Sequence, residues 1–410
     1  MQGDKMKKDI VILGYGLRGS IYGEYAKFRP NEFRVVAVVD VAEEKRNLAQ
    51  SRYGCPVFSD YKQFLAAKIS ADIVAVATQD DDHAEHAVAC MEAGYDLLLE
   101  KPIANTAKDC KLIRDTAARL GRKVIVCHVL RYTPFYRTIK RLLDKGTAGK
   151  VVTIEASENV GFYHQAHSFV RGPWRNSLKS SPMILAKCCH DMDILRWLIG
   201  KKCEKVSSMG GLTYFKESRA PEGSAAYCSR CGVKNCVYRA QDLYLKYRWM
   251  AGYFHVGEQT DEAVLNALKG SAYDRCVYRC DNDVVDHQVT LLGFADGVTV
   301  THSMTAFSKE IYRDIKIHGT QAEIYGVMEN NFIEVRPYDG EKYKIDTSAE
   351  TSEYGGHGGG DAGLMHELYL TLNGEPTEGI SFIDVSAESH SMAFAAEKSR
   401  VAGGVPVEVE

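Results

Sequence analysis

The chain has 410 residues, which is enough for two domains with separate hydrophobic cores. Hydrophobic residues account for 45% and charged residues for 26% of it, the proportions of a soluble globular protein. The net charge of −3 gives no indication of a nucleic-acid partner, and no segment is long and apolar enough to cross a membrane.

The first ten residues, MQGDKMKKDI, carry charges but no apolar stretch, so we expect no secretory signal and a cytoplasmic protein. In that reducing compartment the twelve cysteines are expected to be free thiols rather than a disulfide framework. Several of them lie in or beside predicted strands and helices, where a buried thiol is the expected role.

The first predicted element is a buried strand over residues 10–13, which runs into a glycine-rich turn that matches G-x-G-x-x-G. Gly14 permits the tight turn, Gly16 lets the backbone approach a pyrophosphate, and Gly19 lets the following helix pack against the strand. An ordinary strand–helix turn is the alternative. The predicted cofactor contacts here are Gly14, Gly16, Leu17, Arg18 and Gly19.

A second apolar run over residues 33–39 ends in Asp40, 21 positions after Gly19. A carboxylate at this place would accept hydrogen bonds from the adenosine ribose hydroxyls and repel a 2′-phosphate. The pattern therefore favours NAD over NADP. An ordinary turn residue at the end of a strand is the alternative for Asp40.

Three more short apolar runs, residues 72–78, 95–99 and 123–127, alternate with helical segments and complete the βαβ pattern of a Rossmann dinucleotide-binding domain over residues 1–130. Ligands lie at the carboxyl ends of strands in such a sheet. The loop after the third strand is therefore expected to border the nicotinamide. Its predicted contacts are Thr78, Asp80 and His83, although His83 also suits a helix cap.

The fourth strand ends in Glu100-Lys101-Pro102. This motif, downstream of the glycine-rich turn, resembles the signature of the Gfo/Idh/MocA oxidoreductases, named for glucose–fructose oxidoreductase and inositol dehydrogenase. The resemblance implies that Lys101 lies in the active site beside the nicotinamide, with Glu100 next to the cofactor. A buried lysine there can hydrogen-bond a substrate hydroxyl and exchange a proton with it. The alternative is a surface lysine before a turn-forming proline.

Residues 131–410 are predicted to form an α+β domain with a large, mostly antiparallel sheet and helices on one face. A helical segment over 134–145 opens it, and strand-like runs follow at 151–155, 284–294, 298–304, 313–317 and 322–325. The resemblance covers this half too. It implies that the domain supplies substrate contacts and an oligomer interface, so we expect a homo-oligomer, a dimer or a tetramer.

An apolar helix in this domain carries His190 and Asp193, whose spacing of three places them on one face. The resemblance implies that His190 is the acid/base residue that works with Lys101 on the reacting hydroxyl, since imidazole titrates near neutral pH. It also implies that Asp193 orients the ring or binds the sugar. A satisfied core histidine is the alternative.

The sequence departs from the family pattern at two of the positions that precede His190. The expected glycine is Cys188, and the acid that many members place four residues before the histidine is Ala186. Lys187 stands next to it and is a candidate for a polar role toward the substrate.

The segment 158–176 is dense in planar and hydrogen-bonding side chains. Polyols are recognised by directional hydrogen bonds and by packing of ring faces on aromatic side chains. An arginine here could also pair with an acidic substituent of the substrate. A surface loop with structural aromatics is the alternative. The candidate residues are Tyr163, His164, His167, Arg171, Trp174 and Arg175.

An insertion at about 215–260 carries Cys228, Cys231 and Cys236, hereafter the motif cysteines, spaced C-x2-C-x4-C. Thiolates at this spacing can hold a structural zinc ion. The fourth ligand is left open between Cys203, Cys276, Cys280 and a histidine. Unliganded thiols in a folded insertion are the alternative.

The glycine-rich segment YGGHGGGDAG, residues 354–363, precedes a helical run. Such a segment suits closure over a substrate, or it serves as a solvated linker. Together these features predict an NAD-dependent oxidoreductase acting on a ring hydroxyl of a sugar, sugar acid or cyclitol. One alternative is an oxidoreductive glycosidase that reduces its NADH again within each turnover. Another is a non-catalytic sensor that binds NAD and sugar.

Overall fold

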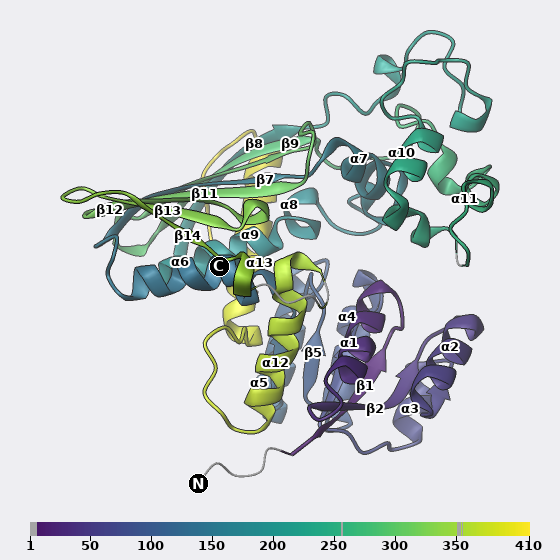
Figure 1. Cartoon of the computed structure of the whole chain (residues 1–410), viewed down its shortest axis with the longest axis horizontal. Helices are drawn as coiled ribbons and strands as arrows, with labels where there is room; N and C mark the ends of the chain where they lie inside the picture. Colours follow the sequence, from purple (N-terminus) through teal and green to yellow (C-terminus); the bar gives the residue numbers. More distant parts are fainter. Residues whose placement is uncertain (1–5, 256, 351–353, 355) are drawn as a thin grey trace.

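A computed structural model describes residues 6–255, 257–350, 354 and 356–410. Residues 1–5, on which the expectation about a secretory signal partly rests, lie outside the described residues. So do residue 256 of the insertion and residue 355 of the glycine-rich segment. Figure 1 shows the two sheets one above the other, with the N-terminal domain below and the larger sheet above. None of the helices in the described part of the chain has the length and hydropathy of a membrane span.

The first sheet is entirely parallel and confirms the predicted Rossmann domain. Each residue of β1 from 10 to 13 is buried because helices cover both faces of the sheet. Its strand order is β3 (Val57–Phe58), β2 (Phe33–Val39), β1 (Lys8–Leu13), β4 (Ile73–Val76), β5 (Leu97–Leu99) and β6 (Val124–Val126). Its helices are α1 (Leu17–Phe28), α2 (Glu43–Tyr53), α3 (Tyr61–Ala66), α4 (His83–Glu92) and α5 (Ala107–Leu120).

The second sheet is mixed but mostly antiparallel, as predicted. Only β7 and β10 run parallel to each other among its described strand pairs. Its order is β14 (Tyr343–Asp346), β13 (Phe332–Pro337), β12 (Ala322–Val327), β11 (Tyr312–Gly319), β7 (Val151–Asn159), β10 (Thr299–Thr305), β9 (His287–Phe294), β8 (Cys203–Gly211) and β15 (Val407–Glu408).

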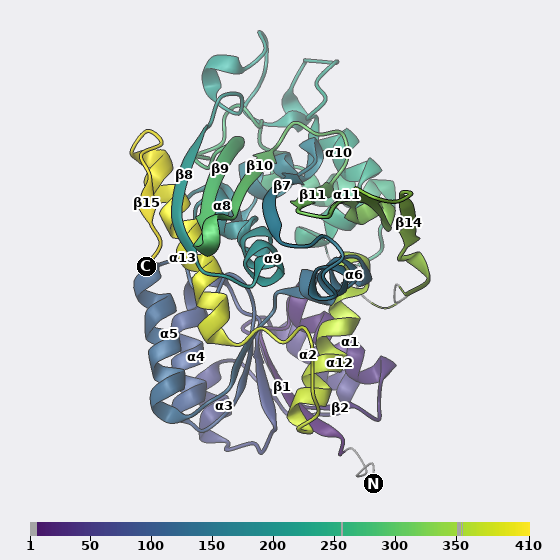
Figure 2. The same ribbon diagram turned by 90° about the vertical axis from the view of Figure 1, so that its left-hand side faces the viewer.

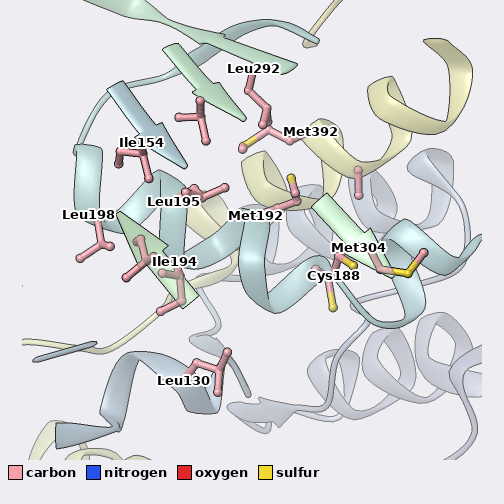
Figure 3. Packing of buried hydrophobic residues seen from close by; sticks show 14 of the residues in the cluster. Leu130, Ile154, Cys188, Met192, Ile194, Leu195, Leu198, Leu292, Met304 and Met392 are labelled. Carbon is pink, nitrogen blue, oxygen red and sulfur yellow. The ribbon is translucent and has the colours of Figure 1, made fainter. Parts of the chain in front are cut away.

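Strict alternation of buried and half-exposed residues along β11 shows that one face of this sheet is covered and the other is open. The covering helices are α6 (Pro134–Asp144), α8 (Met183–Ala186), α9 (Cys189–Ile199) and α13 (Ile383–Val401). Figure 3 shows Met192 and Leu195 of α9 and Met392 of α13 packed near Ile154 and Leu292 of the sheet. Helix α9 therefore sits at the centre of the core, which places His190 rigidly.

The C-terminal helices return to the first domain. Helix α12 (Gly360–Leu372) buries Leu364 and Leu368 in the same apolar cluster as Ile10 and Ile12 of β1. Helix α13 contributes to the cores of both halves, and Figure 2 shows it running beside α5. The last strand of the first sheet ends at residue 126, and the first strand of the second sheet begins at residue 151. Helix α12, however, packs in the core of the first domain. The domain division at residue 130 stays a prediction.

The segment between β8 and β9 forms a separate lobe with its own apolar cluster. Figure 1 shows this lobe beyond the end of the second sheet, above the helices of the first domain. Its helices are α10 (Ala240–Lys246) and α11 (Asp261–Leu268), and it packs on α7 (Phe162–His164) and the π-helical turn η3 (Gln165–Arg171). The predicted insertion at 215–260 lies within this lobe.

Short 3₁₀ turns connect the longer elements. They are η1 (Asp80–Asp82), η2 (Val129–Tyr132), η4 (Pro173–Arg175), η5 (Glu217–Arg219), η6 (Cys228–Arg230), η7 (Arg248–Tyr253), η8 (Ala272–Asp274), η9 (Ala295–Gly297), η10 (Met328–Asn330), η11 (Ser348–Glu350) and η12 (His357–Gly359).

Candidate active site

The three glycines of the first turn differ in what a side chain would meet. Gly14 has a φ of +94°, and a Cβ there would lie 2.5 Å from the carbonyl oxygen of Ala77. A Cβ on Gly19 would collide with the carbonyl oxygen of Gly14, whereas one on Gly16 meets no atom of the described chain within 4 Å. Gly14 and Gly19 therefore serve the fold. Gly16 leaves open space at the N-terminus of α1, where an anion is favoured.

Asp40 is buried at the end of β2 and already holds the turn around it. Its two carboxylate oxygens accept hydrogen bonds from the backbone nitrogens of Tyr15 and Ala42, both at 2.8 Å. A carboxylate offers about four acceptor sites, so two remain for a ribose diol. The turn role and the cofactor role are compatible, and the cofactor role stays a prediction.

Arg18 joins two buried carboxylates that lie far apart in the sequence. Its Nε is 2.5 Å from Glu100 Oε1, and its Nη2 is 2.8 Å from Asp361 Oδ1 on α12. Burial alone would raise the pKa of Glu100, but the Arg18 charge and a hydrogen bond from Tyr22 outweigh it and lower that pKa. Arg18 thus ties the strand end before Lys101 to α12. Direct contact of Arg18, Leu17 and Glu100 with a cofactor stays a prediction.

Two buried histidines hold the loop that carries Lys101. His83 Nδ1 lies 2.8 Å from the Pro102 carbonyl oxygen, and His390 Nε2 on α13 accepts a hydrogen bond from Ile103 N at 2.9 Å. The Lys101 Nζ donates to the carbonyl oxygen of Ala186 at 3.4 Å, just before α9. The loop is therefore fixed from α4, α13 and α8 together.

The loop after β4 contacts the second domain through Asp80, a predicted cofactor residue, which meets Trp174, a predicted substrate residue. Trp174 Nε1 donates a hydrogen bond to Asp80 Oδ2 at 2.9 Å. Thr78 Oγ1 lies 3.0 Å from His86 Nδ1 at the start of α4. The structure thus brings Asp80 and Trp174 together at the junction of the two domains, and their ligand roles stay predictions.

His190 lies on α9, near enough to Lys101 for the lysine charge to act on its imidazole. It is 6% exposed, and its Nδ1 has no hydrogen-bond partner within the described part of the chain. Burial and then the charge of Lys101 hold the pKa of His190 far below its ordinary value. The imidazole is therefore neutral at neutral pH. The rings of His128 and His357 flank it at 5.8 and 6.2 Å.

Asp193 is fully buried and forms a bidentate pair with Arg131. Both oxygens lie 2.6 Å from guanidinium nitrogens, and His128 Nε2 is 3.7 Å from Oδ1. The Arg131 charge overcomes the effect of burial and lowers the pKa of Asp193. Arg131 thus already binds the carboxylate of Asp193, which was predicted to orient the His190 ring or to bind the sugar. That assignment remains untested.

The candidate sugar-binding segment divides into two groups. Tyr163 stacks on Tyr247 at 3.8 Å, and His167 lies 3.0 Å from Tyr244 Oη and stacks on Tyr273. Arg171 donates to two backbone carbonyls of the lobe, and Arg175 pairs with Asp281. These four residues anchor the lobe to α7, η3 and η4.

His164 belongs to the other group. Burial, followed by the charges of Lys187 and other neighbours including Lys101, places its pKa well below the ordinary value. The charge of Lys101 thus reaches His164, and Trp174 contacts Asp80 in the loop after β4. Lys187 Nζ is 3.2 Å from Glu158, a fully buried carboxylate that also pairs with Arg313.

Two family models match this architecture. The model of the oxidoreductase family with an NAD-binding Rossmann fold matches residues 8–128, and the model of the GFO/IDH/MocA C-terminal domain matches residues 136–325. Together they cover most of the chain. The chain belongs to the Gfo/Idh/MocA oxidoreductase family.

Several known proteins resemble this Gfo/Idh/MocA chain. The protein YteT of Bacillus subtilis (strain 168), which bears an oxidoreductase name without a stated substrate, is 29% identical over 319 residues, 73% of this chain and 72% of its own. Inositol 2-dehydrogenase 2 of Saccharopolyspora erythraea is 32% identical over 48% of this chain and 55% of its own length. A levoglucosan dehydrogenase solved with NADH and L-sorbose has a TM-score of 0.73 at 18% identity and 99% coverage of both chains, which shows the fold.

No finding supports a zinc ion held by the three motif cysteines alone. Among the described residues, one group of three potential ligand atoms lies within 4.8 Å of one another, and it consists of Cys188, Asp191 and His302. The motif cysteines do not form such a group. Arg313 Nε already lies 3.0 Å from Asp191 Oδ1, so a cation occupies that position.

Sequence reasoning missed four buried residues around the Gfo/Idh/MocA site, namely His128, Arg131, Asp361 and His390. The first two follow β6 at its carboxyl end, where ligand-binding residues of a parallel sheet gather, and this rule could have indicated them. Asp361 lies in the glycine-rich segment, which was noted only for closure. His390 carries no local signal, because its partner Ile103 lies 287 positions earlier.

Proposed function

We propose that this chain is an NAD-dependent oxidoreductase that transfers hydride between a ring hydroxyl of a sugar, sugar acid or cyclitol and the nicotinamide. Two observations support the proposal: Lys101 Nζ donates to the Ala186 carbonyl just before α9, and the charge of Lys101 acts on the buried His190 of that helix. The names of the inositol and levoglucosan dehydrogenases among the similar proteins support a cyclic polyol as the substrate class.

The proposed cofactor is NAD, which supplies the hydride acceptor when it is bound. The open N-terminus of α1 at Gly16 suits the pyrophosphate, and the free acceptor capacity of Asp40 suits the ribose hydroxyls. A buried carboxylate at this position disfavours the 2′-phosphate of NADP. The proposal therefore predicts a clear preference for NAD.

Proton transfer is assigned to His190 and Lys101. The neutral imidazole is proposed to accept the hydroxyl proton as hydride leaves the carbon. The ammonium of Lys101, oriented by the carbonyl of Ala186, hydrogen-bonds the same oxygen and stabilises its developing negative charge.

The substrate is proposed to lie between His164, Trp174 and Lys187 on one side and the lobe on the other. Two aromatic residues of η7, Trp249 and Tyr253, remain 50% and 36% exposed. The ring of Trp249 lies 5.8 Å from that of His164. Burial raises the pKa of Tyr253, and the charge of Arg18 acts against it. These rings suit the apolar face of a pyranose or cyclitol.

The test is a panel of sugars, sugar acids, cyclitols and aryl glycosides, assayed with NAD and with NADP while absorbance of the reduced cofactor is followed. The proposal predicts net NADH formation with a free polyol, and loss of that activity in Lys101→Met. Release of an aglycone without NADH accumulation would support the oxidoreductive glycosidase instead. Binding of NAD and sugar without turnover, unchanged in Lys101→Met, would support the sensor.

We further propose that the protein is cytoplasmic and forms a dimer or tetramer through the open face of the second sheet. Met209 of β8 lies directly opposite Val289 of β9, and Leu291 follows on the same face. All three apolar side chains are largely exposed. Apolar residues that line up on an open sheet indicate an interface. Light scattering after size exclusion tests this, since Val289→Lys should shift the mass to the monomer.

A further inference from the structure

Four cysteines of the lobe line one small cavity. The motif cysteines reach it from the segment around η6, and Cys276 reaches it from the segment after η8. The cavity encloses about 20 Å³, roughly the space of one water-sized species. Cys203 lies in β8 and does not line this cavity, and neither does Cys280, whose thiol donates to the Cys276 carbonyl. The cavity thus selects Cys276 among the candidates that the sequence left open.

A buried guanidinium faces the same cavity. Arg171 is 1% exposed, and its nitrogens donate to the carbonyl oxygens of Arg275 and Tyr238 and to Cys228 Sγ at 3.6 Å. Its Nη1 has no partner in the described chain, and no carboxylate of the described residues forms an ion pair with it. A buried cation without an anion is costly. Something with negative charge is therefore expected beside Arg171.

Neutral thiols do not supply that charge. A bound metal cation brings that charge with it, because the ligand of a metal is the thiolate and binding releases the thiol proton. Four thiolates around a divalent ion carry a net charge of −2, which the guanidinium of Arg171 offsets in part.

We propose that Cys228, Cys231, Cys236 and Cys276 are the ligands of a thiophilic metal centre, either a zinc ion or an iron–sulfur cluster. The four S–H protons pass to solvent, and four metal–sulfur bonds replace them without any change of oxidation state of the cysteines. Arg171 donates its hydrogen bond to the Cys228 sulfur of this centre. The assignment does not depend on the proposed function.

The spacing of the sulfurs bears on which metal is held. No three of these four sulfurs lie within 4.8 Å of one another in the described structure. A tetrahedral zinc ion with bonds of about 2.3 Å holds its sulfurs about 3.8 Å apart. A cluster separates them further, since its iron and sulfide atoms stand between them. The spacing of the sulfurs favours a cluster, whereas the cavity volume of about 20 Å³ favours a single ion. The metal content decides between the two.

The centre would close a loop that carries the exposed aromatics of η7. Between Cys236 and Cys276 lie α10, η7 and α11, and the two segments already meet at the Tyr227–Arg275 bridge and through Cys276 N to Ala226 O at 2.9 Å. A metal cross-link at this point fixes the base of the lobe. Trp249 and Tyr253 are then held at a defined distance from the first domain.

The test is the metal content of the full chain, purified without chelator under anaerobic conditions. Zinc, iron and acid-labile sulfide are measured per chain, together with the visible absorption spectrum. We expect either one zinc per chain, or iron and sulfide with a thiolate-to-iron absorption band. Cys276→Ser should reduce the metal content to background. The matched control Cys280→Ser, four residues away and outside the cavity, should retain it.

A second measurement keeps the test decisive if Cys276→Ser does not fold. In the unmodified chain, the four cavity thiols should resist alkylation as purified and become alkylated after a strong chelator is added, as read by peptide mass spectrometry. A chain purified without zinc or iron that also takes up neither metal would overturn the proposal. Full metal content in Cys276→Ser would do the same.

Discussion

At the scale of single residues, histidine serves several purposes within a small volume. His83 and His390 hydrogen-bond the backbone around Lys101, His128 lies buried against the Asp193–Arg131 pair, and His190 keeps a free nitrogen. Residue type alone does not separate these roles. An unpartnered ring nitrogen does not separate them either, since His83 Nε2 and both nitrogens of His128 also lack hydrogen-bond partners in the described chain. The distinguishing observation is which charges lie near each ring, Asp193 for His128 and Lys101 for His190.

The first prediction concerns the pH dependence of catalysis. Because burial and Lys101 hold the pKa of His190 well below 6.5, the imidazole stays neutral and able to accept a proton at pH 6.5 and below. The kcat/KM for polyol oxidation should therefore fall only at a pH clearly below the pKa of a free histidine, about 6.5. His190→Asn should lower kcat by about 10²-fold or more.

The control for this experiment is His318→Asn. His318 lies near the end of β11, beside Glu155 and Glu323 and away from Lys101 and His190. The substitution should leave both kcat and the pH profile unchanged. An acid limb centred near pH 6.5 in the unmodified enzyme would show that Lys101 does not act on His190 as described.

At the scale of elements, the turn between β1 and α1 was predictable in position and in the separate purposes of its glycines. The motif alone did not show that Arg18 and Asp40 would also form ion pairs and hydrogen bonds with other parts of the protein. Their partners, Asp361 and the backbone of Tyr15 and Ala42, depend on how distant segments meet. Local patterns predict elements well because the forces that shape a turn are local.

The second prediction separates the two glycine functions. Gly19→Ala places a methyl group against the Gly14 carbonyl and should lower the free energy of unfolding by about 1–3 kcal/mol without cofactor. Gly16→Ala meets no atom within 4 Å, so stability should stay within about 0.5 kcal/mol of the unmodified chain. The added methyl group obstructs the pyrophosphate, and the Kd for NAD should rise at least tenfold.

Urea unfolding and titration calorimetry on the same preparations measure both effects. Equal NAD affinity in Gly16→Ala and the unmodified chain would place the pyrophosphate elsewhere.

The third prediction concerns the loop of Lys101. His390→Phe keeps the ring volume but removes the acceptor of the Ile103 N–H, and an unsatisfied buried donor costs about 1–3 kcal/mol. Because the loop then loses one of its supports, kcat should fall while the KM for NAD changes little. His390→Gln, whose side-chain oxygen can accept the same hydrogen bond, should restore part of kcat. A loss of stability without any effect on kcat would make His390 merely structural.

At the scale of the whole molecule, the two-sheet plan was predictable because each half carries its own strand pattern. The lobe contacts of His167 and Arg171 were not, since a segment rich in polar and aromatic residues does not reveal which way each side chain faces. The return of α12 and α13 to the first domain was also missed. Its driving force is apolar burial between residues more than 300 positions apart, such as Ile12 and Leu364.

The last prediction follows from the number of buried neutral histidines. Burial, the first cause in each case, lowers the pKa of His128 to about 4 and that of His167 and His390 to about 3. An unfolded chain takes up these protons below a pKa of about 6.5, whereas the folded chain does not. The unfolded state therefore binds more protons as the pH falls, so acid destabilises the fold between pH 6.5 and 4.

Each such histidine should cost about 1.3 kcal/mol between pH 7 and pH 5.5, so these three together lower the free energy of unfolding by about 4 kcal/mol. Urea unfolding at several pH values measures this slope. His167→Phe keeps an aromatic ring against Tyr273 but removes one titrating group, and it should lessen the loss between pH 7 and pH 5.5 by about 1.3 kcal/mol. A stability that is constant from pH 7 to pH 5.5 would mean that these rings gain protons without unfolding, and the buried histidine environments described here would be incorrect.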